Sequence, residues 1–172
     1  MSFLENTLNW PPILRVRRNH ALEHATLQIL SRKHLVRAAA GYSDTGGFWI
    51  MGQVKTDALQ EAVDEALVRL RGGERQLAIH PNCGTNFVAA GAVAGTLAWL
   101  GMAGNRDGFR RDLERLPVLI SLVTVGIIMA QPLGTYLQAH FTVEPEIGDL
   151  RVTEIDRLQR TDTVIHRVRT IN

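Results

Sequence analysis

The chain has 172 residues, 45% of them hydrophobic and 21% charged, which excludes general disorder. Its net charge is +2, and the arginines are spread along the chain without interleaved aromatic residues. This pattern argues against nucleic-acid binding and better fits a protein face near anionic lipid. Its one cysteine, Cys83, excludes an internal disulfide framework.

Residues 1–18 are predicted to form an interfacial segment at a membrane surface. They lack the basic start, the continuous apolar core and the cleavage site of a signal peptide. Trp10 stands among apolar residues, and Arg15, Arg17 and Arg18 follow it, as at a membrane–water boundary. The alternative is a flexible tail that packs on the domain.

Residues 19–35 are predicted to form an amphipathic helix with Asn19 as its N-cap. This helix carries the string His20-Ala-Leu-Glu23-His24, an H-x-x-E-H motif. Histidines four apart on a helix lie one turn above each other, so both imidazoles can reach one metal ion. Glu23 can reach a metal-bound water as a general base without being a ligand.

Residues 36–80 are predicted to form a small ββαβ unit. Its elements are the strands Ala38–Ser43 and Gly47–Val54 with the turn Asp44–Gly46 between them, the amphipathic helix Thr56–Arg71 capped by Thr56 or Asp57 and stopped by Gly72 and Gly73, and the short strand Arg75–His80. The strand Gly47–Val54 could offer an edge on which an extended substrate lies.

Residues 81–139 are predicted to form a transmembrane helical hairpin. The uncharged stretches Phe87–Ala103 and Pro117–Ala139 are long enough to span a bilayer, and the charged segment Asn105–Leu116 separates them. Small residues recur every four positions and would let the helices approach closely: Gly91 and Gly95, then Gly126, Ala130 and Gly134. The alternative is a buried helical hairpin in a soluble protein.

Residues 140–172 are predicted to form a C-terminal β-hairpin. Alternating apolar residues in Leu150–Leu158 and Thr163–Ile171 flank a polar turn, and this hairpin would extend the preceding sheet. The predicted fold class is therefore an α+β membrane protein, with a motif helix, a ββαβ unit, a two-helix transmembrane hairpin and a C-terminal β-hairpin.

The metal would need a further ligand, because a catalytic zinc usually has three protein ligands and one open position. His80 is the first candidate, since it ends a predicted strand and Pro81 makes the turn there rigid. Cys83 is the alternative, because a thiolate binds zinc well and a helix start lowers the thiol pKa. Thr85 or Asn86 would cap the helix that follows, and its N-terminus could stabilise an oxyanion.

Each of these residues also has an ordinary structural interpretation. Histidine pairs four apart arise by chance on helices, and a free cysteine is usually a small buried hydrophobe. The remaining histidines have no partner at ligand spacing and are predicted to be surface or interface residues: His34, His140 and His166. The two motifs together favour the metal site over these interpretations.

The two motifs resemble known families. His20-Ala-Leu-Glu23-His24 is similar to the inverted motif of the inverzincin metallopeptidases, in which the histidines bind zinc, the glutamate is the base and a later glutamate is the third ligand. Glu61 and Glu65 are candidates for that last role here, although a solvated helix face suits them better.

A closer resemblance is to the YqhQ-type bacterial membrane proteins, described as predicted metal-dependent enzymes. That family pairs a His-Gly-Ala-Glu-His-like string with His-Pro-Arg-Cys-Gly-Thr-Ser-Phe ahead of a membrane helix. The counterparts here are residues 20–24 and 80–87. The chain departs from the family in having Asn82 and Asn86, fewer membrane helices and a longer insertion between the motifs.

These observations predict a membrane-anchored zinc-dependent hydrolase, a metallopeptidase acting at or within the membrane surface. Zn²⁺ would be held by His20, His24 and His80, with Glu23 as the catalytic base. The protein would sit in the bacterial cytoplasmic membrane with its flanking domains in the cytosol, although the arginines of the short loop argue for the opposite orientation. The expected partners are the lipid bilayer and a protein or peptide substrate, and no nucleic acid is expected. Two membrane helices are few to enclose a site, which favours a homodimer.

Two alternatives stay open at this stage. The first is a non-catalytic metal-binding membrane scaffold or assembly factor, in which the three histidines and Cys83 give four protein ligands and no open position. The second makes Cys83 a nucleophile with a histidine as its base.

Overall fold

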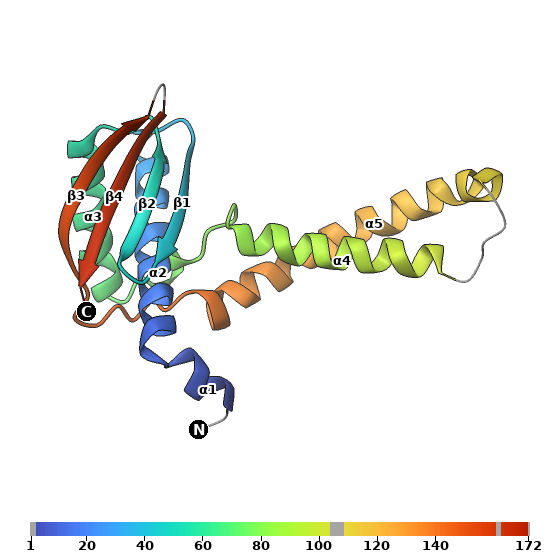
Figure 1. Cartoon of the computed structure of the whole chain (residues 1–172), viewed down its shortest axis with the longest axis horizontal. Coiled ribbons are helices and arrows are strands. Elements are labelled where there is room, and N and C mark those ends of the chain that lie inside the picture. Colours follow the sequence, from blue (N-terminus) through green and yellow to red (C-terminus); the bar gives the residue numbers. More distant parts are fainter. Residues whose placement is uncertain (1–2, 104–108, 161–162, 172) are drawn as a thin grey trace. The chain divides into compact units, whose positions relative to one another are not determined.

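The computed structural model describes residues 3–103, 109–160 and 163–171. The chain forms two compact units (Figure 1). The first unit combines Met1–His80 with Ala139–Asn172, and the second unit is Pro81–Gln138. The mixed α+β class predicted from the sequence is confirmed.

The first unit is built on a four-stranded antiparallel sheet with the strand order β1-β2-β4-β3. Its strands are β1 (Ala39–Asp44), β2 (Gly47–Gly52), β3 (Arg151–Arg160) and β4 (Thr163–Ile171). Both predicted hairpins are confirmed, and the C-terminal one extends the sheet through pairing of β4 with β2. Helices α2 and α3 cover one face of the sheet (Figure 1).

Alternation along β2 decides which face is buried. Phe48 and Ile50 are fully buried, whereas the intervening Trp49 and Met51 are on the opposite face, as the two-residue repeat of a strand requires. The inward residues pack with apolar residues of α2 and α3 into one core cluster, which includes Leu22, Ile29, Leu30, Leu59, Val63, Leu77, Ile147, Leu150 and Val168.

Helix α2 (Pro11–Arg32) begins eight residues earlier than the sequence predicts. Pro11 and Pro12 occupy its first turn, where a missing N–H costs nothing and the fixed φ of proline suits the helix. The N-cap is therefore Trp10, and the prediction of Asn19 in that role is wrong. Asn19 is buried, donates to the carbonyl of Asp44 and accepts from the hydroxyl of Thr170, both at 2.7 Å.

The first residues form a short helix, α1 (Phe3–Leu8), in which no side chain is buried. Phe3 is 84% exposed, and Trp10, which follows the helix, is 60% exposed. Exposed aromatic side chains suit the predicted interfacial segment. Its place at a membrane surface stays a prediction.

The predicted strand Arg75–His80 is wrong, and the unit is ββα rather than ββαβ. Arg75–Ala78 is a 3-10 turn that packs Leu77 and Ala78 into the core. The segment packs against α2 and α3 instead of joining the sheet.

Helix α3 (Thr56–Arg71) has the bounds that the sequence predicts. All six predicted apolar positions are buried: Leu59, Ala62, Val63, Ala66, Leu67 and Leu70. Gly72 is the C-cap, as expected, but the N-cap is Lys55 rather than Thr56 or Asp57. The hydroxyl of Thr56 instead lies 3.0 Å from Nε2 of His166.

His166 is fully buried on β4, inside the first unit, so the prediction that it is a surface or interface residue is wrong. Among the described residues its Nδ1 has no hydrogen-bond partner. Burial lowers the pKa of His166 below its ordinary value of 6.5, and the charge of Arg157 lowers it further. His34 and His140 are exposed, as predicted.

This buried histidine predicts a pH dependence of folding. Below pH 6.5 His166 is protonated in the unfolded chain but stays neutral in the folded one. The free energy of unfolding therefore falls as the pH drops from 6.5 towards the lowered pKa of the folded state. In His166→Gln this contribution to the pH dependence should vanish. Thermal unfolding of both full-length proteins across this pH range measures it; equal slopes would contradict the assignment.

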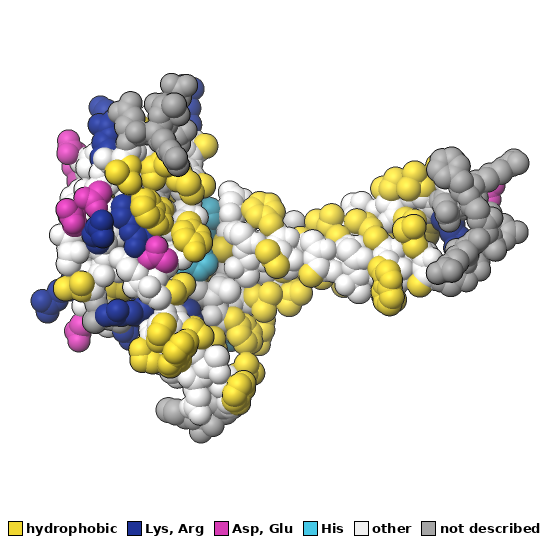
Figure 2. Space-filling model, viewed as in Figure 1, with side chains coloured by type: hydrophobic (Ala, Val, Ile, Leu, Met, Phe, Trp, Pro, Cys, Tyr) yellow, Lys and Arg dark blue, Asp and Glu magenta, His cyan; other side chains and the backbone are white. Residues whose placement is uncertain are grey.

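The second unit is a pair of helices, α4 (Gly84–Met102) and α5 (Phe109–Leu137), followed by a π-helical turn at Gln138–Thr142. The helix α4 and residues 113–142 are long and apolar enough to cross a membrane. Patches of hydrophobic side chains recur along the described part of the hairpin (Figure 2). The charged connection is shorter than the predicted Asn105–Leu116, because α5 already begins at Phe109; residues 104–108 lie outside the described residues.

The start of α4 differs from the sequence prediction. The N-cap is Cys83, and neither Thr85 nor Asn86 has that role. Asn86 uses its side chain differently: Nδ2 donates to the carbonyl of Pro81 at 2.6 Å, and Oδ1 accepts from Nε2 of Gln138, also at 2.6 Å. Asn86 therefore ties the turn after His80 to the end of α5.

Only one of the two predicted small-residue faces lies against the other helix among the described residues. Gly126 packs on Leu97 and Val93, and Gly134 packs on Asn86. A Cβ at Gly91 or at Gly95 would meet nothing within 4 Å, so the close approach predicted for that face is wrong within the described hairpin.

The packing of Gly134 gives a matched prediction. A Cβ there would lie 2.9 Å from Cα of Asn86, so Gly134→Ala should force the helices apart and destabilise the protein by about 1–3 kcal/mol. Gly91→Ala adds the same atom in open space and should leave stability unchanged or slightly raised. Thermal unfolding of the two variants in one detergent compares them; equal melting temperatures would refute this helix contact.

Candidate metal centre

Helix α2 brings the residues of the first motif together in the first unit. His20 and His24 lie four residues apart, and their ring centroids are 4.2 Å apart with the rings edge-on. Glu23 and His24 are 3% and 2% exposed, and His20 is partly buried. The sequence predicts these neighbouring imidazoles, but it does not predict how deeply Glu23 is buried.

In both His20 and His24, Nδ1 of the ring is hydrogen-bonded to a backbone carbonyl. Nδ1 of His20 lies 3.0 Å from the carbonyl oxygen of Thr142, and Nδ1 of His24 lies 2.6 Å from that of Ala78. A carbonyl oxygen only accepts, so each Nδ1 carries a hydrogen, and in the neutral imidazole, the form that binds a metal, the lone pair is on Nε2. Such a bond from the second ring nitrogen fixes the orientation and tautomer of metal-binding histidines.

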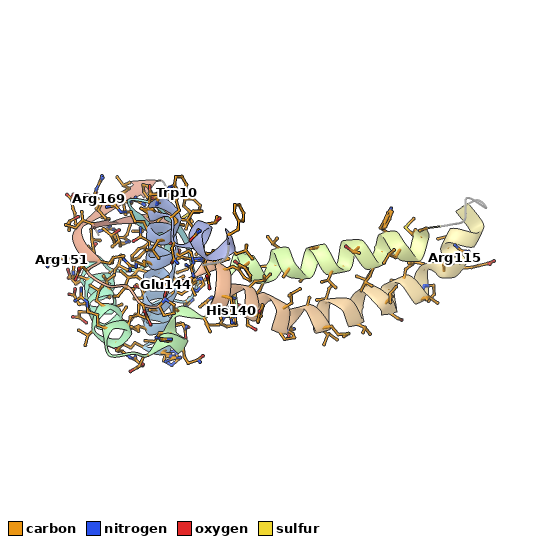
Figure 3. The ribbon with its side chains drawn as sticks, turned by 90° about the horizontal axis from the view of Figure 1, so that it is seen from below. Trp10, Arg115, His140, Glu144, Arg151 and Arg169 are labelled. Carbon is orange, nitrogen blue, oxygen red and sulfur yellow. The ribbon has the colours of Figure 1, made fainter. Side chains whose placement is uncertain are left out.

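The carbonyl of Thr142 is held in place by contacts with α2. Arg17 donates to the carbonyl of Val143 at 3.1 Å, and the N–H of Glu144 donates to the carbonyl of Arg17 at 3.0 Å. The carboxylate of Glu144 pairs with Arg17 at 3.3 Å, and Figure 3 shows Glu144 against this helix. The acceptor of the His20 hydrogen bond is therefore anchored to the helix that carries His20.

The segment that ends in His80 is anchored to α2 one turn after His24. The side-chain amide of Gln28 donates to the carbonyls of Leu77 and Ile79 at 2.9 and 2.8 Å. The ring centroids of His24 and His80 lie 5.6 Å apart. Burial lowers the pKa of His80, and the neighbouring His24 lowers it further, so the neutral, ligand form of the imidazole is favoured.

Glu23 lies against strand β1. The hydroxyl of Ser43 donates to its Oε2 at 2.5 Å, and a Cβ on Gly41 would overlap the carboxylate. Burial raises the pKa of Glu23; the Ser43 hydrogen bond and the nearby His20 offset part of that rise. A buried carboxylate with a raised pKa and a fixed orientation is suited to accept a proton as a general base.

Cys83 belongs to the second unit. It is buried, and its thiol lies 3.5 Å from the hydroxyl of Thr85. Three peptide units separate it from His80, so the Cα atoms of these two residues can be at most about 11 Å apart. Glu61 is exposed on α3, and Glu65 pairs with Lys33 and Arg69, which leaves neither in the role of a ligand.

These residues have the chemistry of a zinc site. Two imidazoles with Nδ1 bound to carbonyls and a third, neutral imidazole beside them are nitrogen donors of the kind that zinc prefers. Sequence reasoning did not identify Gln28, Gly41, Ser43 or Thr142. Gly41 and Ser43 are two apart on a predicted strand and so share a face, but the sequence does not say that this face meets Glu23.

Comparison with known proteins adds a family. A family model described as "Domain of unknown function (DUF6391)" matches residues 15–155, most of the chain, including both motifs. The chain belongs to the DUF6391 family. The resemblance of this DUF6391 protein to the YqhQ-type and inverzincin families, carried by two short motifs, stays a prediction.

A relative of this DUF6391 protein is an uncharacterized protein of Picosynechococcus sp. (strain ATCC 27264 / PCC 7002 / PR-6). The two are 34% identical over 144 residues, which cover 76% of this chain and 66% of the relative. The match thus spans about two thirds of the relative's length. No solved structure matches the chain.

Proposed function

We propose that this DUF6391 protein is a membrane-anchored, zinc-dependent hydrolase of the peptidase class. His20, His24 and His80 would hold the metal, with Cys83 as the alternative to His80. The observation that carries the proposal is the pair of hydrogen bonds from Nδ1 of His20 and of His24 to backbone carbonyls, because they orient both Nε2 atoms as ligands.

The chemistry at this site would combine a Lewis acid with a buried base. When bound, zinc supplies a polarised water and a positive charge beside the reacting carbonyl. Glu23 would take one proton from the attacking water as its oxygen bonds to the carbonyl carbon. The same carboxyl group would then give that proton to the leaving nitrogen as the C–N bond breaks, so the base returns to its starting form.

The hairpin supports the membrane part of the proposal. In a soluble protein, helices as apolar as α4 and α5 would be mostly buried. Here only 6% and 11% of the two candidate membrane windows are buried. Exposed apolar surface of this extent is stable in lipid rather than in water.

Proteolysis by the zinc-loaded protein tests the proposal. Full-length protein in detergent should cleave members of a quenched fluorescent peptide library, lose this activity with 1,10-phenanthroline and regain it with added Zn²⁺. His24→Ala, purified in the same way, is the matched control for contaminating proteases. Cleavage that persists in that variant, or none by zinc-loaded wild type, would refute the proposal.

A second function is favoured by the position of Cys83. This buried cysteine follows His80 by three residues, close enough along the chain for both to bind one metal. The three histidines and Cys83 would then give four protein ligands and no open position. Such a protein would be a metal-binding scaffold or assembly factor. X-ray absorption of the zinc-loaded protein separates the two, since sulfur in a full set of protein ligands supports the scaffold and a water ligand supports the hydrolase.

A further inference from the structure

Strand β1 forms one edge of the sheet, and among the described residues no other strand pairs with its outer side (Figure 1). The sequence predicted an edge at Gly47–Val54, but β2 lies between β1 and β4, so that prediction is wrong. An edge strand presents a row of backbone N–H and C=O groups that can pair with another extended segment.

The two edges of this sheet differ in how they are protected. Sheet edges are commonly guarded against pairing by charged side chains or proline. The outer strand β3 is charged along its length, with Arg151, Glu154, Asp156 and Arg157. The strand β1 reads Ala-Ala-Gly-Tyr-Ser-Asp, and its one charged residue, Asp44, lies at the end of the strand and pairs with Arg167. The less guarded edge therefore belongs to the strand whose face touches the candidate base.

The contact with Glu23 places this edge beside the chemistry. Gly41 lies against the carboxylate of Glu23, and Ser43 donates to it. Neighbouring strands in a sheet lie about 4.8 Å apart. A segment paired with the outer side of β1 would therefore lie one strand spacing from the two residues that hold the base.

We propose that the free edge of β1 binds the substrate as an added strand, so that the substrate is an extended polypeptide segment. This inference rests on the proposed hydrolase function. Backbone hydrogen bonds to β1 would supply affinity with little dependence on sequence, and alternate side chains of the substrate would supply selectivity. The competing occupant is β1 of a second copy, which would close the edge to substrate.

The test uses hydroxamates as probes, because a hydroxamate binds zinc without being cleaved. Full-length zinc-loaded protein in detergent is titrated with acetohydroxamate and with the tetrapeptide Ala-Leu-Ala-Leu bearing a C-terminal hydroxamate. The peptide probe should bind at least tenfold more tightly. Within residues 39–44, hydrogen exchange should slow at the alternate amides that do not already bond to β2, and it should stay unchanged in β3, which serves as the internal control.

Methylation of the probe's backbone nitrogens, one at a time, gives the sharper measurement. An added strand donates from alternate residues, so methylation should weaken binding at least tenfold at every second position and little at the positions between. Equal weakening at all positions, or equal affinity for both probes, would overturn the inference while leaving the zinc site intact. A protein that binds neither zinc nor acetohydroxamate would refute the proposed function instead.

The oligomeric state of the purified protein shows whether the edge of β1 is occupied by a second copy rather than by substrate. If β1 pairs with a second copy, the purified protein is a dimer in which the outward-facing amides of β1, those that do not bond to β2, are protected without any probe. That result would overturn the inference. A protein in which the β1 amides that do not bond to β2 exchange freely until the peptide probe is added supports it.

Discussion

Glu23→Gln should lower the rate of peptide hydrolysis by about 100-fold or more while leaving the metal bound. The substitution keeps the shape and the hydrogen bond with Ser43 but removes the group that accepts a proton. Loss of a positioned general base lowers the rate by about 10²–10⁴-fold. Cleavage of the peptide library and zinc content, measured on the same preparation, check the two parts of the prediction.

The matched control is Glu61→Gln, which makes the same change at an exposed position of α3. It should cleave peptides at the wild-type rate. Undiminished cleavage by Glu23→Gln would remove Glu23 from the mechanism. Loss of zinc from that variant would make Glu23 a ligand rather than a base.

Gly41→Ala should impair the site through the position of Glu23. The new Cβ would overlap the carboxylate, and both groups are confined between β1 and α2. We expect the carboxylate to move and hydrolysis to fall by about 10²-fold, as for other small displacements of reacting groups. The overlap should also lower stability by about 1–3 kcal/mol.

Gly91→Ala serves as the control for this variant, because its Cβ would meet nothing within 4 Å. Zinc content, cleavage and thermal unfolding are compared between the two. A Gly41→Ala protein with normal cleavage would show that the carboxylate of Glu23 need not be held where it lies. A variant that binds no zinc would place the effect on the histidines instead.

Local sequence signals predicted most of the elements. The alternation in residues 39–52 and 151–171 and the periodicity of residues 56–71 indicate strands and a helix that the structure confirms. The early start of α2 differs from the prediction because Pro11 and Pro12, which would break a helix in its interior, are compatible with its first turn.

The errors came from contacts between distant segments. Residues 75–78 form a turn because Leu77 and Ala78 pack against α2 and α3, and the residues of α2 that receive them are about fifty positions away in sequence. His166 looked like a surface residue because its buried neighbours and its partner Thr56 are far away in sequence. No local pattern carries this information.

The sequence predicted the metal-binding histidines of the candidate site but not the groups that hold them in place. The four-residue spacing indicated that His20 and His24 face one point. The hydrogen bonds that orient them end on backbone carbonyls of Thr142 and Ala78, and a carbonyl belongs to every residue, so no residue type marks the partner. The contact of Ser43 with Glu23 likewise depends on how β1 crosses α2.

The most direct measurement is the zinc content of the full-length protein, purified in parallel as wild type, His20→Ala, His80→Ala and His34→Ala. His34 is exposed and serves as the control. The account predicts one zinc per chain in wild type and in His34→Ala, and loss of stoichiometric zinc in His20→Ala and His80→Ala. Wild type without zinc, or all four proteins with equal zinc, would contradict a shared metal centre.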